Sequence, residues 1–158
     1  MKYSLQSWLL GLACIGIVIA DQASKWLTIT YGTAAEYAIN TGVCWGIGGE
    51  FTAQYVLFSW ALRLGIFIFT LFVVWQGVCA HNLHKRLWPY ALIVVGAFSN
   101  SIDRMIFDGV IDFIVLKLSL PVFGTFNWPW FNIADIAIVG GLCGLLYYEL
   151  LCTCQARS

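Results

Sequence analysis

Asp112 and Asp135 are the two residues of this sequence whose type and placement best suit chemistry. The basic residues nearest to Asp112 are Arg104 and Lys117, and neither stands at a spacing that shares a helix face with it. Two carboxylates held close together cannot both ionise easily, so one pKa rises and the other falls. The ionised group can then take a proton from water, while the protonated group donates one to a carbonyl oxygen or a leaving nitrogen. This is aspartic-peptidase chemistry, which needs no metal ion and no nucleophilic Ser or Cys.

Other charged residues of the chain allow a plainer interpretation. Asp21 and Lys25 are four residues apart, which is the spacing of an ion pair on one helix face. Asp103 and Arg104 are adjacent and could also pair. Spacing alone therefore favours Asp112 and Asp135 as the chemical pair, and it leaves open that the acids as a group serve only in ion pairs.

The overall composition indicates that these acids belong to a membrane protein. Of the 158 residues, 61% are hydrophobic and only 10% are charged, whereas a soluble domain is about 45–50% apolar and about 25% charged. A soluble chain of this length could not bury so much apolar surface. The 8 basic and 8 acidic residues balance, so the chain lacks the basic surface that nucleic-acid binding requires.

Four apolar stretches are long enough to cross a membrane, because a spanning helix needs about 20 mostly apolar residues. They predict spans at about 8–29, 55–78, 87–106 and 131–151 within a single integral membrane domain over 1–158. The expected fold class is therefore an all-α membrane protein. Its four transmembrane helices would be joined by extracytoplasmic loops with room for a small β element.

The distribution of charge predicts how the chain is oriented. With four spans, the N-terminus, the loop after the second span and the C-terminus lie on one side of the membrane. These three segments carry basic residues: Lys2, Lys85, Arg86 and Arg157. Such segments face the cytoplasm, so both termini are expected there. Seven of the 8 acids then fall at the outer side: Asp21, Glu36, Glu50, Asp103, Asp108, Asp112 and Asp135. Because charges in spans are costly, this gathering marks either function or ion pairing near the outer surface.

The cysteines and histidines predict no metal site. No CxxC pair and no Cys/His spacing of a zinc site occurs among the 6 cysteines and 2 histidines. Most of the cysteines lie in or at the ends of apolar stretches, where they pack as small apolar residues. We therefore expect neither a metal ion nor a cofactor.

Two functions other than proteolysis could use the same acids. A small ion-coupled transporter or channel subunit would relay ions through them, but its charges would be spread across the membrane depth. Here the middle of each predicted span is free of acids. A non-catalytic scaffold protein would hold all the acids in structural pairs, and the spacing of the residues does not exclude it.

Five segments, in order along the chain, resemble motifs of bacterial lipoprotein signal peptidase, also called signal peptidase II. They are DQASK at 21–25, NTGVCWG at 40–46, GAFSNSIDR at 96–104, GVIDF at 109–113 and FNIAD at 131–135. Each segment alone is a weak signal. Five in the same order, near the ends of four predicted spans, form a specific match that covers most of the chain.

The resemblance implies an intramembrane aspartic endopeptidase with Asp112 and Asp135 as its catalytic dyad. Such an enzyme removes the signal peptide from diacylglyceryl-modified prolipoproteins and cuts just before the lipidated cysteine. The family works in the bacterial inner membrane with its active site near the extracytoplasmic face, and it is the target of the cyclic peptide globomycin. The expected partners are prolipoprotein substrates and membrane lipids, with no nucleic acid, and the chain is expected to be a monomer.

The resemblance also implies roles for the other matching residues. Those expected to bind substrate or shape the site are Asn40, Asn100, Arg104, Asn132 and Ala134. Those expected to support the structure are Asp21, Lys25 and Asp103, with Asp103 holding Arg104.

The sequence departs from the family pattern at three places. Ser99 stands where the family usually has Gly, and Cys44 and Trp45 stand where it has Ala and Phe. The segment between Asp112 and Asp135 is longer than is typical. None of these departures removes a proposed catalytic group.

A group of small residues in the fourth span has two interpretations. Gly140, Gly141 and Gly144 could let the apolar helix of a signal peptide approach this span. They could equally serve close packing between two spans of the protein itself.

Overall fold

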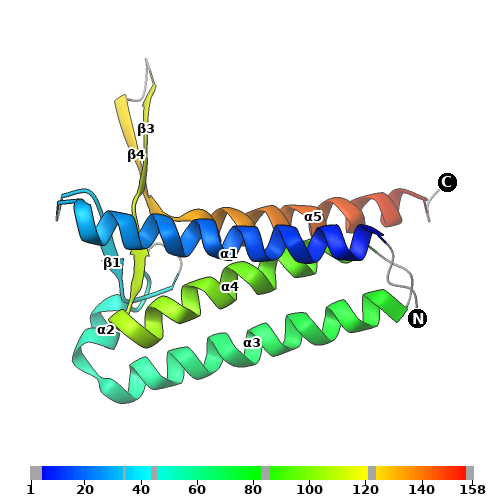
Figure 1. Ribbon diagram of the computed structural model, residues 1–158, viewed down its shortest axis with the longest axis horizontal. Helices are drawn as coiled ribbons and strands as arrows, with labels where there is room; N and C mark the ends of the chain where they lie inside the picture. The colour runs from blue at the N-terminus through cyan, green and yellow to red at the C-terminus, as the bar shows by residue number, and fades with distance from the viewer. Residues whose placement is uncertain (1–4, 34, 44–45, 83–85, 121–123, 156–158) are drawn as a thin grey trace.

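Four long helices form the body of the protein. The computed structural model describes residues 5–33, 35–43, 46–82, 86–120 and 124–155. The four helices are α1 (Leu5–Tyr31), α3 (Val56–Asn82), α4 (Trp88–Phe107) and α5 (Ile133–Gln155). Each is long and apolar enough to cross a membrane. The helical membrane fold predicted from the sequence is thus confirmed (Figure 1).

The apolar surface of the bundle is turned outward, as a lipid environment requires. Only 6% of the spanning window is buried in α1 and in α3, against 33% in α4. Helix α4 packs against each of the other three long helices and is therefore the central one. In lipid every backbone N–H and C=O must be satisfied within the chain, which is why these apolar stretches are helical throughout.

Helices α4 and α5 approach each other closely at small residues. A Cβ atom at Gly141 would lie 2.5 Å from the backbone oxygen of Pro89, and one at Gly144 would collide with the ring of Trp88. These glycines therefore serve packing between two helices of the protein. Of the two interpretations of this group, the structure favours helix packing for Gly141 and Gly144.

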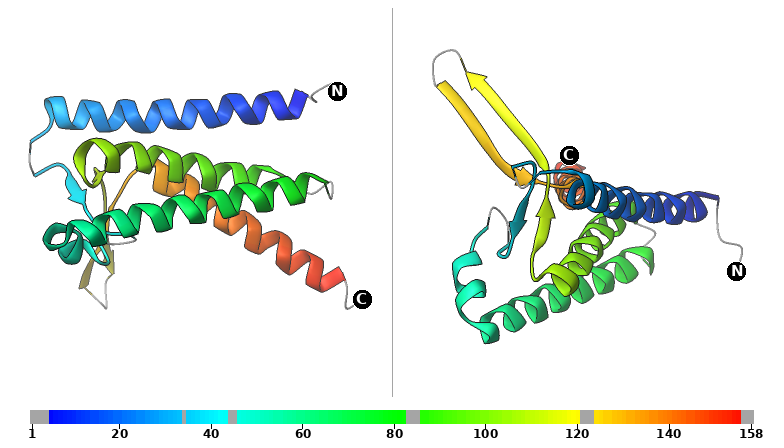
Figure 2. Two further views of the ribbon diagram at one scale, coloured as in Figure 1. Left: turned by 90° about the horizontal axis from the view of Figure 1, so that it is seen from below. Right: turned by 60° about the vertical axis from the view of Figure 1, so that its left-hand side comes forward.

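Short elements gather at one end of the bundle, where α1 and α4 end and α5 begins (Figures 1 and 2). They are the helix α2 (Gly49–Gln54) and the strands β1 (Ala38–Asn40), β2 (Val110–Asp112), β3 (Ile114–Leu120) and β4 (Gly124–Phe131). Strand β1 pairs antiparallel with β2, and β3 pairs antiparallel with β4. The small β element that the loops were expected to hold is therefore present as two sheets of two strands.

The β3–β4 hairpin occupies most of the segment between Asp112 and Asp135. It leaves the bundle crosswise to α1 and stands away from the helices (Figure 1). The turn that leads into β2 begins at Asp108, which ends α4 with a left-handed φ of 58°. That turn reverses the chain at the end of α4 and brings Asp112 back toward the helices.

We predict that Gly141→Ala destabilises the protein, whereas the neighbouring substitution Gly140→Ala does not. A Cβ at Gly141 has no room beside the Pro89 oxygen, but one at Gly140 would lie 3.8 Å from Leu92, an ordinary contact. Overpacking of this kind costs about 1–3 kcal/mol. Thermal unfolding in detergent should give a lower midpoint for Gly141→Ala alone. Equal midpoints for the two variants would contradict the packing described above.

Candidate active site

Asp112 is the last residue of β2 and is 3% exposed. Its Oδ1 accepts a hydrogen bond of 2.7 Å from Nδ2 of Asn132, and its Oδ2 accepts one of 3.2 Å from Nδ2 of Asn40. Both oxygens are therefore oriented by amide groups, one from the residue before α5 and one from β1. The pairing of β1 with β2 brings Asn40 to this position.

Asp135 lies in the first turn of α5 and takes part in a reciprocal cap with Asn132. The backbone N–H of Asp135 donates to Oδ1 of Asn132 over 2.9 Å, and the backbone N–H of Asn132 donates to Oδ2 of Asp135 over 3.1 Å. This is a capping-box arrangement, which satisfies two N–H groups at the start of a helix. The helix terminus also favours a negative charge there. The same contacts thus begin α5 and hold the Asp135 carboxylate.

Two buried asparagines connect Asp112 to Asp135. Nδ2 of Asn132, which donates to Asp112, also lies 3.1 Å from Oδ1 of Asn100. Nδ2 of Asn100 donates to Oδ1 of Asp135 over 2.8 Å. The two carboxylates therefore belong to one hydrogen-bonded cluster, although 20 residues of sequence separate Asp112 from Asn132.

A buried ammonium group supports this cluster from α1. Lys25 is 1% exposed, and its Nζ lies 2.7 Å from Oδ2 of Asp21 and 2.7 Å from Oδ2 of Asp103. It also donates to Oδ1 of Asn100 over 2.9 Å. All three ammonium hydrogens have an acceptor, which a buried charge needs in order to be tolerated.

Each acid that binds Lys25 also holds the backbone beside one of the two site aspartates. Oδ1 of Asp21 accepts the N–H of Ala134, the residue before Asp135, over 3.0 Å. Oδ2 of Asp103 accepts the N–H of Ile111, the residue before Asp112, over 3.2 Å. The ion-paired triad of Asp21, Lys25 and Asp103 therefore fixes the chain on both sides of the cluster.

The ion-pair partner of Asp103 in the structure is Lys25, rather than the adjacent Arg104 that was expected. Asp103 pairs with Lys25, while Nη2 of Arg104 donates to the backbone oxygen of Gly42 over 2.8 Å. Adjacent residues in a helix point about 100° apart, and Asp103 and Arg104 accordingly contact different segments, α1 and the loop after β1. Arg104 instead fixes the loop that follows β1, where the N–H of Gly42 also donates to Oδ1 of Asn40 over 3.0 Å.

The structure brings the predicted site residues into one network of hydrogen bonds and ion pairs: Asp112, Asp135, Asn40, Asn100, Arg104, Asn132, Ala134, Asp21, Lys25 and Asp103. Two further members were not expected as functional residues. Oγ of Ser99, which is fully buried, donates to Asp21 over 2.7 Å. Nε2 of Gln22 donates to Asp103 over 2.9 Å and lies 3.1 Å from Oγ of Ser99.

Ser99, which stands where the family usually has Gly, thus adds a hydrogen bond between α4 and α1. The departures at Cys44 and Trp45 lie outside the described residues. The sequence did contain a signal for the Asn132 cap, since Asn followed three residues later by an acid at a helix start is a capping pattern. No comparable spacing signals the contacts of Gln22 and Ser99, which join α1 to α4.

The surroundings of Asp112 change its acidity. Burial, and after it the negative charge of Asp135, raise the pKa of Asp112 from 3.8 to about 6. The hydrogen bonds from Asn40 and Asn132 and the charge of Lys25 act in the opposite direction. A carboxyl group that titrates near 6 can gain and lose a proton close to neutral pH, as general acid–base chemistry requires.

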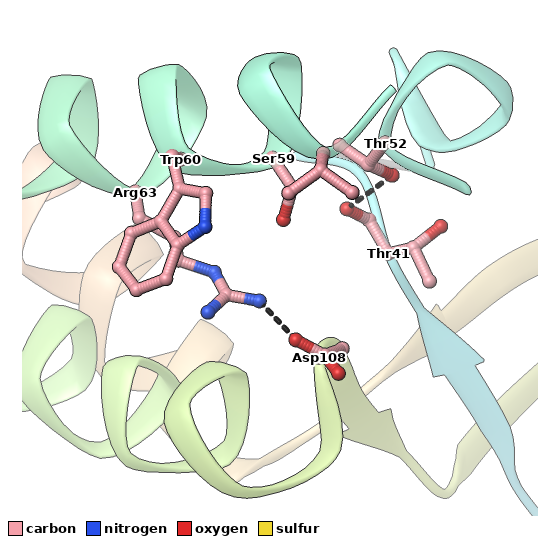
Figure 3. A pocket seen from close by; sticks show the side chains of 7 residues that line it. Thr41, Thr52, Ser59, Trp60, Arg63 and Asp108 are labelled. Atoms are coloured by element: carbon pink, nitrogen blue, oxygen red, sulfur yellow. Dashed lines mark hydrogen bonds and ion pairs between the residues drawn. The ribbon is translucent and has the colours of Figure 1, made fainter. Parts of the chain in front are cut away.

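A pocket lies at the same end of the bundle, between α3 and the end of α4 (Figure 3). It is lined by Thr41, Thr52, Val56, Ser59, Trp60, Arg63 and Asp108, and so by neither site aspartate. Arg63 forms an ion pair with Asp108, and its guanidinium carbon lies 5.1 Å from the centre of the Trp60 ring. These contacts tie α3 to the residue that ends α4.

We predict that Lys25→Met is strongly destabilising. The substitution leaves Asp21 and Asp103 buried without their cation, and breaking a buried ion pair from one side costs about 3–5 kcal/mol. The thermal unfolding midpoint in detergent should fall sharply for Lys25→Met and recover in part when Asp103→Asn is added. A Lys25→Met protein as stable as the native one would show that the triad does not hold the fold.

We predict that the stability of the protein falls between about pH 4 and pH 6 because of Asp112. Folding raises this pKa from 3.8 to about 6, so the folded state binds a proton that the unfolded chain has released. The stabilisation is complete below pH 3.8 and is lost as the pH rises through about 6. It amounts to at most ~3 kcal/mol at 1.36 kcal/mol per pKa unit.

The measurement is the unfolding free energy across this pH range for the native protein and for Asp112→Asn, which cannot titrate. The native protein should lose stability relative to the variant as the pH rises. A constant difference between the two across the range would contradict the raised pKa.

Comparison with known proteins identifies the family. A model of the signal peptidase II family matches residues 13–151. The lipoprotein signal peptidase of Nitrobacter hamburgensis is 30% identical over 161 residues, covering 93% of this chain and 94% of the relative. That of Xanthomonas oryzae pv. oryzae is 36% identical over 111 residues, covering 70% of this chain and 63% of the relative.

Solved structures of similar fold are bacterial membrane enzymes. One, at 25% identity, has a TM-score of 0.68 and covers 96% of this chain and 92% of its own. Another, also at 25% identity, has a TM-score of 0.63, and the match covers 94% of this chain and 96% of that chain. The family model spans nearly all of the four-helix bundle and the cluster at its end, and the chain therefore belongs to the signal peptidase II family, whose members are multi-pass membrane peptidases that remove signal peptides from prolipoproteins.

Proposed function

We propose that this protein is an intramembrane aspartic endopeptidase that cuts diacylglyceryl-modified prolipoproteins just before the lipidated cysteine. Asp112 and Asp135 are its catalytic residues. The observation that carries the proposal is the pair of carboxylates, Asp112 buried and Asp135 half-buried, that Asn132 and Asn100 join at one end of four long apolar helices. Membership of the signal peptidase II family supports the same reaction class.

In the proposed reaction, Asp112 and Asp135 share one proton between them. The ionised carboxylate takes a proton from a water molecule, and the oxygen of that water attacks the carbonyl carbon of the peptide bond. The protonated carboxyl group donates its proton to the carbonyl oxygen, which gives a tetrahedral diol. A proton then passes to the peptide nitrogen, the C–N bond breaks, and a carboxylic acid and the amine of the cysteine residue are released. Two coupled carboxylates titrate as a unit, so the roles belong to the pair.

The surrounding polar residues would position this pair and the substrate. Asn132 and Asn100 orient the two carboxylates through the hydrogen bonds described above. Arg104 and Asn40 fix the loop at Gly42, which we propose to face the substrate backbone. The backbone around Ala134 is closely packed, because a Cβ atom at Gly96 would collide with the Ala134 oxygen.

The depth of the site suits a lipid-modified substrate. The cluster lies at the end of the bundle that we propose to face the outside of the bacterial inner membrane, with both termini in the cytoplasm. A diacylglyceryl group anchors the cysteine in the outer leaflet, so the peptide bond before it reaches the same level. The acyl chains can stay in lipid while the signal peptide lies against the bundle. We expect the chain to act as a monomer without a metal ion or cofactor.

The proposed chemistry predicts that Asp112→Asn and Asp135→Asn each lose cleavage of a diacylglyceryl-modified prolipoprotein by about 10²–10⁴-fold, because each removes a general acid–base group. Asp108→Asn is the matched control, since this exposed carboxylate lies four residues before Asp112 and outside the cluster. The assay uses purified protein in detergent, with release of the signal peptide as the readout.

Three results would count against the proposal. Near-full cleavage by either variant would exclude the aspartic mechanism, and loss of native activity on adding a chelator would indicate a metal enzyme. Equal cleavage of an unmodified precursor would exclude recognition of the lipid. Inhibition by globomycin in the same assay is the expected pharmacological result.

A further inference from the structure

The β3–β4 hairpin has two chemically different faces. Directly opposed residues of an antiparallel pair share a face, and successive residues alternate between faces. The register sets Leu116 opposite Trp128, with Phe126 two residues along the strand from Trp128. It sets Lys117 opposite Asn127 and Ser119 opposite Thr125. One face therefore carries Leu116, Phe126 and Trp128, and the other carries Lys117, Ser119, Thr125 and Asn127.

The apolar face is open to the surroundings of the protein. Leu116 is 43% exposed, Phe126 is 50% exposed and Trp128 is 39% exposed. The rings of Phe126 and Trp128 meet edge to face at 6.1 Å, so they form one continuous apolar surface. An exposed apolar patch on a sheet that is polar on its other face indicates an interaction surface.

The direction of the hairpin indicates what that surface meets. The long helices are long and apolar enough to cross a membrane along their length, and the hairpin leaves their end crosswise to them (Figures 1 and 2). A segment that is crosswise to spanning helices at their ends runs along the membrane surface.

The polar face is turned away from the membrane. Lys117, on that face, lines a pocket together with residues from the base of the hairpin and from the segment after α1: Phe113, Val115, Trp130, Ala35 and Glu36. That segment lies beyond the end of the span, and Figure 1 shows it on the opposite side of the hairpin from the main length of the helices. The face that carries Phe126 is therefore turned back toward the level of the bilayer.

We propose that the β3–β4 hairpin lies in the lipid interface, with Leu116, Phe126 and Trp128 inserted among the phospholipids. Trp is enriched at this level of membrane proteins, where its ring is apolar and its N–H reaches polar groups. Lys117 stays on the aqueous side. This contact with lipid does not depend on the proposed peptidase function.

The contact would also set the depth of the site. Asp112 stands two residues before β3, and Asn132 directly follows β4. At the base of the hairpin the N–H of Phe113 donates to the backbone oxygen of Phe131 over 3.1 Å, so the two ends of the hairpin are held together. A hairpin that rests on the bilayer thus holds both ends of the cluster at one level.

The test is photo-crosslinking to lipid in nanodiscs of phosphatidylcholine and phosphatidylglycerol. The photoreactive residue p-benzoylphenylalanine replaces Phe126 in one protein and Asn127 in another, so that two neighbouring positions sample opposite faces of one strand. Leu116 and Lys117 form the matched pair on the other strand. Phe67, which is 60% exposed in the middle of α3, is the positive control for lipid contact. Intact-protein mass spectrometry measures the yield of phospholipid adducts.

We expect several-fold more adduct at 126 than at 127, and at 116 than at 117. Equal yields on the two faces, or no adduct at 126 and 116 when position 67 reacts, would overturn the proposal. An adduct with the mass of a second protein chain would overturn it in favour of an interface between copies. The thermal unfolding midpoint of each labelled protein shows that it is folded, and the cleavage assay reports separately on the peptidase function.

Discussion

The buried ammonium group of Lys25 is the interaction on which the rest of the structure depends. It forms ion pairs with both Asp21 and Asp103, and all three side chains are buried. Those two acids are then free to use their remaining lone pairs on the backbone beside the site, at Ala134 and at Ile111. One cation from α1 thus orders segments from α4, β2 and α5. The cost of burying three charges is offset by their ion pairs and hydrogen bonds with one another and with Asn100.

Much of this fold could be predicted from the sequence, for a simple reason. Lipid allows few arrangements of the backbone, so an apolar run such as 88–107 has to be a helix. The gathering of acids at one end of the spans follows from the same argument, because a charge such as Asp21 or Asp103 is least costly near the membrane surface. The site could therefore be located before any contact was known.

The contacts themselves could not be predicted. The ion pair between Asp103 and Lys25 depends on how α1 is rotated against α4, and no spacing rule gives that rotation. The sequence therefore offered only the adjacent Arg104 as a partner for Asp103. The pairing of β1 with β2 joins Ala38 to Asp112 although α2, α3 and α4 lie between them in the sequence, and short strands carry little sequence signal. Ser99 could be identified as a departure from the family pattern, but its hydrogen bond to Asp21 depends on the same rotation.

The capping contacts of Asn132 and Asp135 make the start of α5 and the candidate site a single unit. No span contains that site by itself: Asn100 comes from α4, Asn40 from β1 and the supporting lysine from α1. A chain whose last helix has not yet packed therefore has no complete site, and the carboxylates of Asp112 and Asp135 are not yet aligned. Completion of membrane insertion would itself complete the site of a protease of this design.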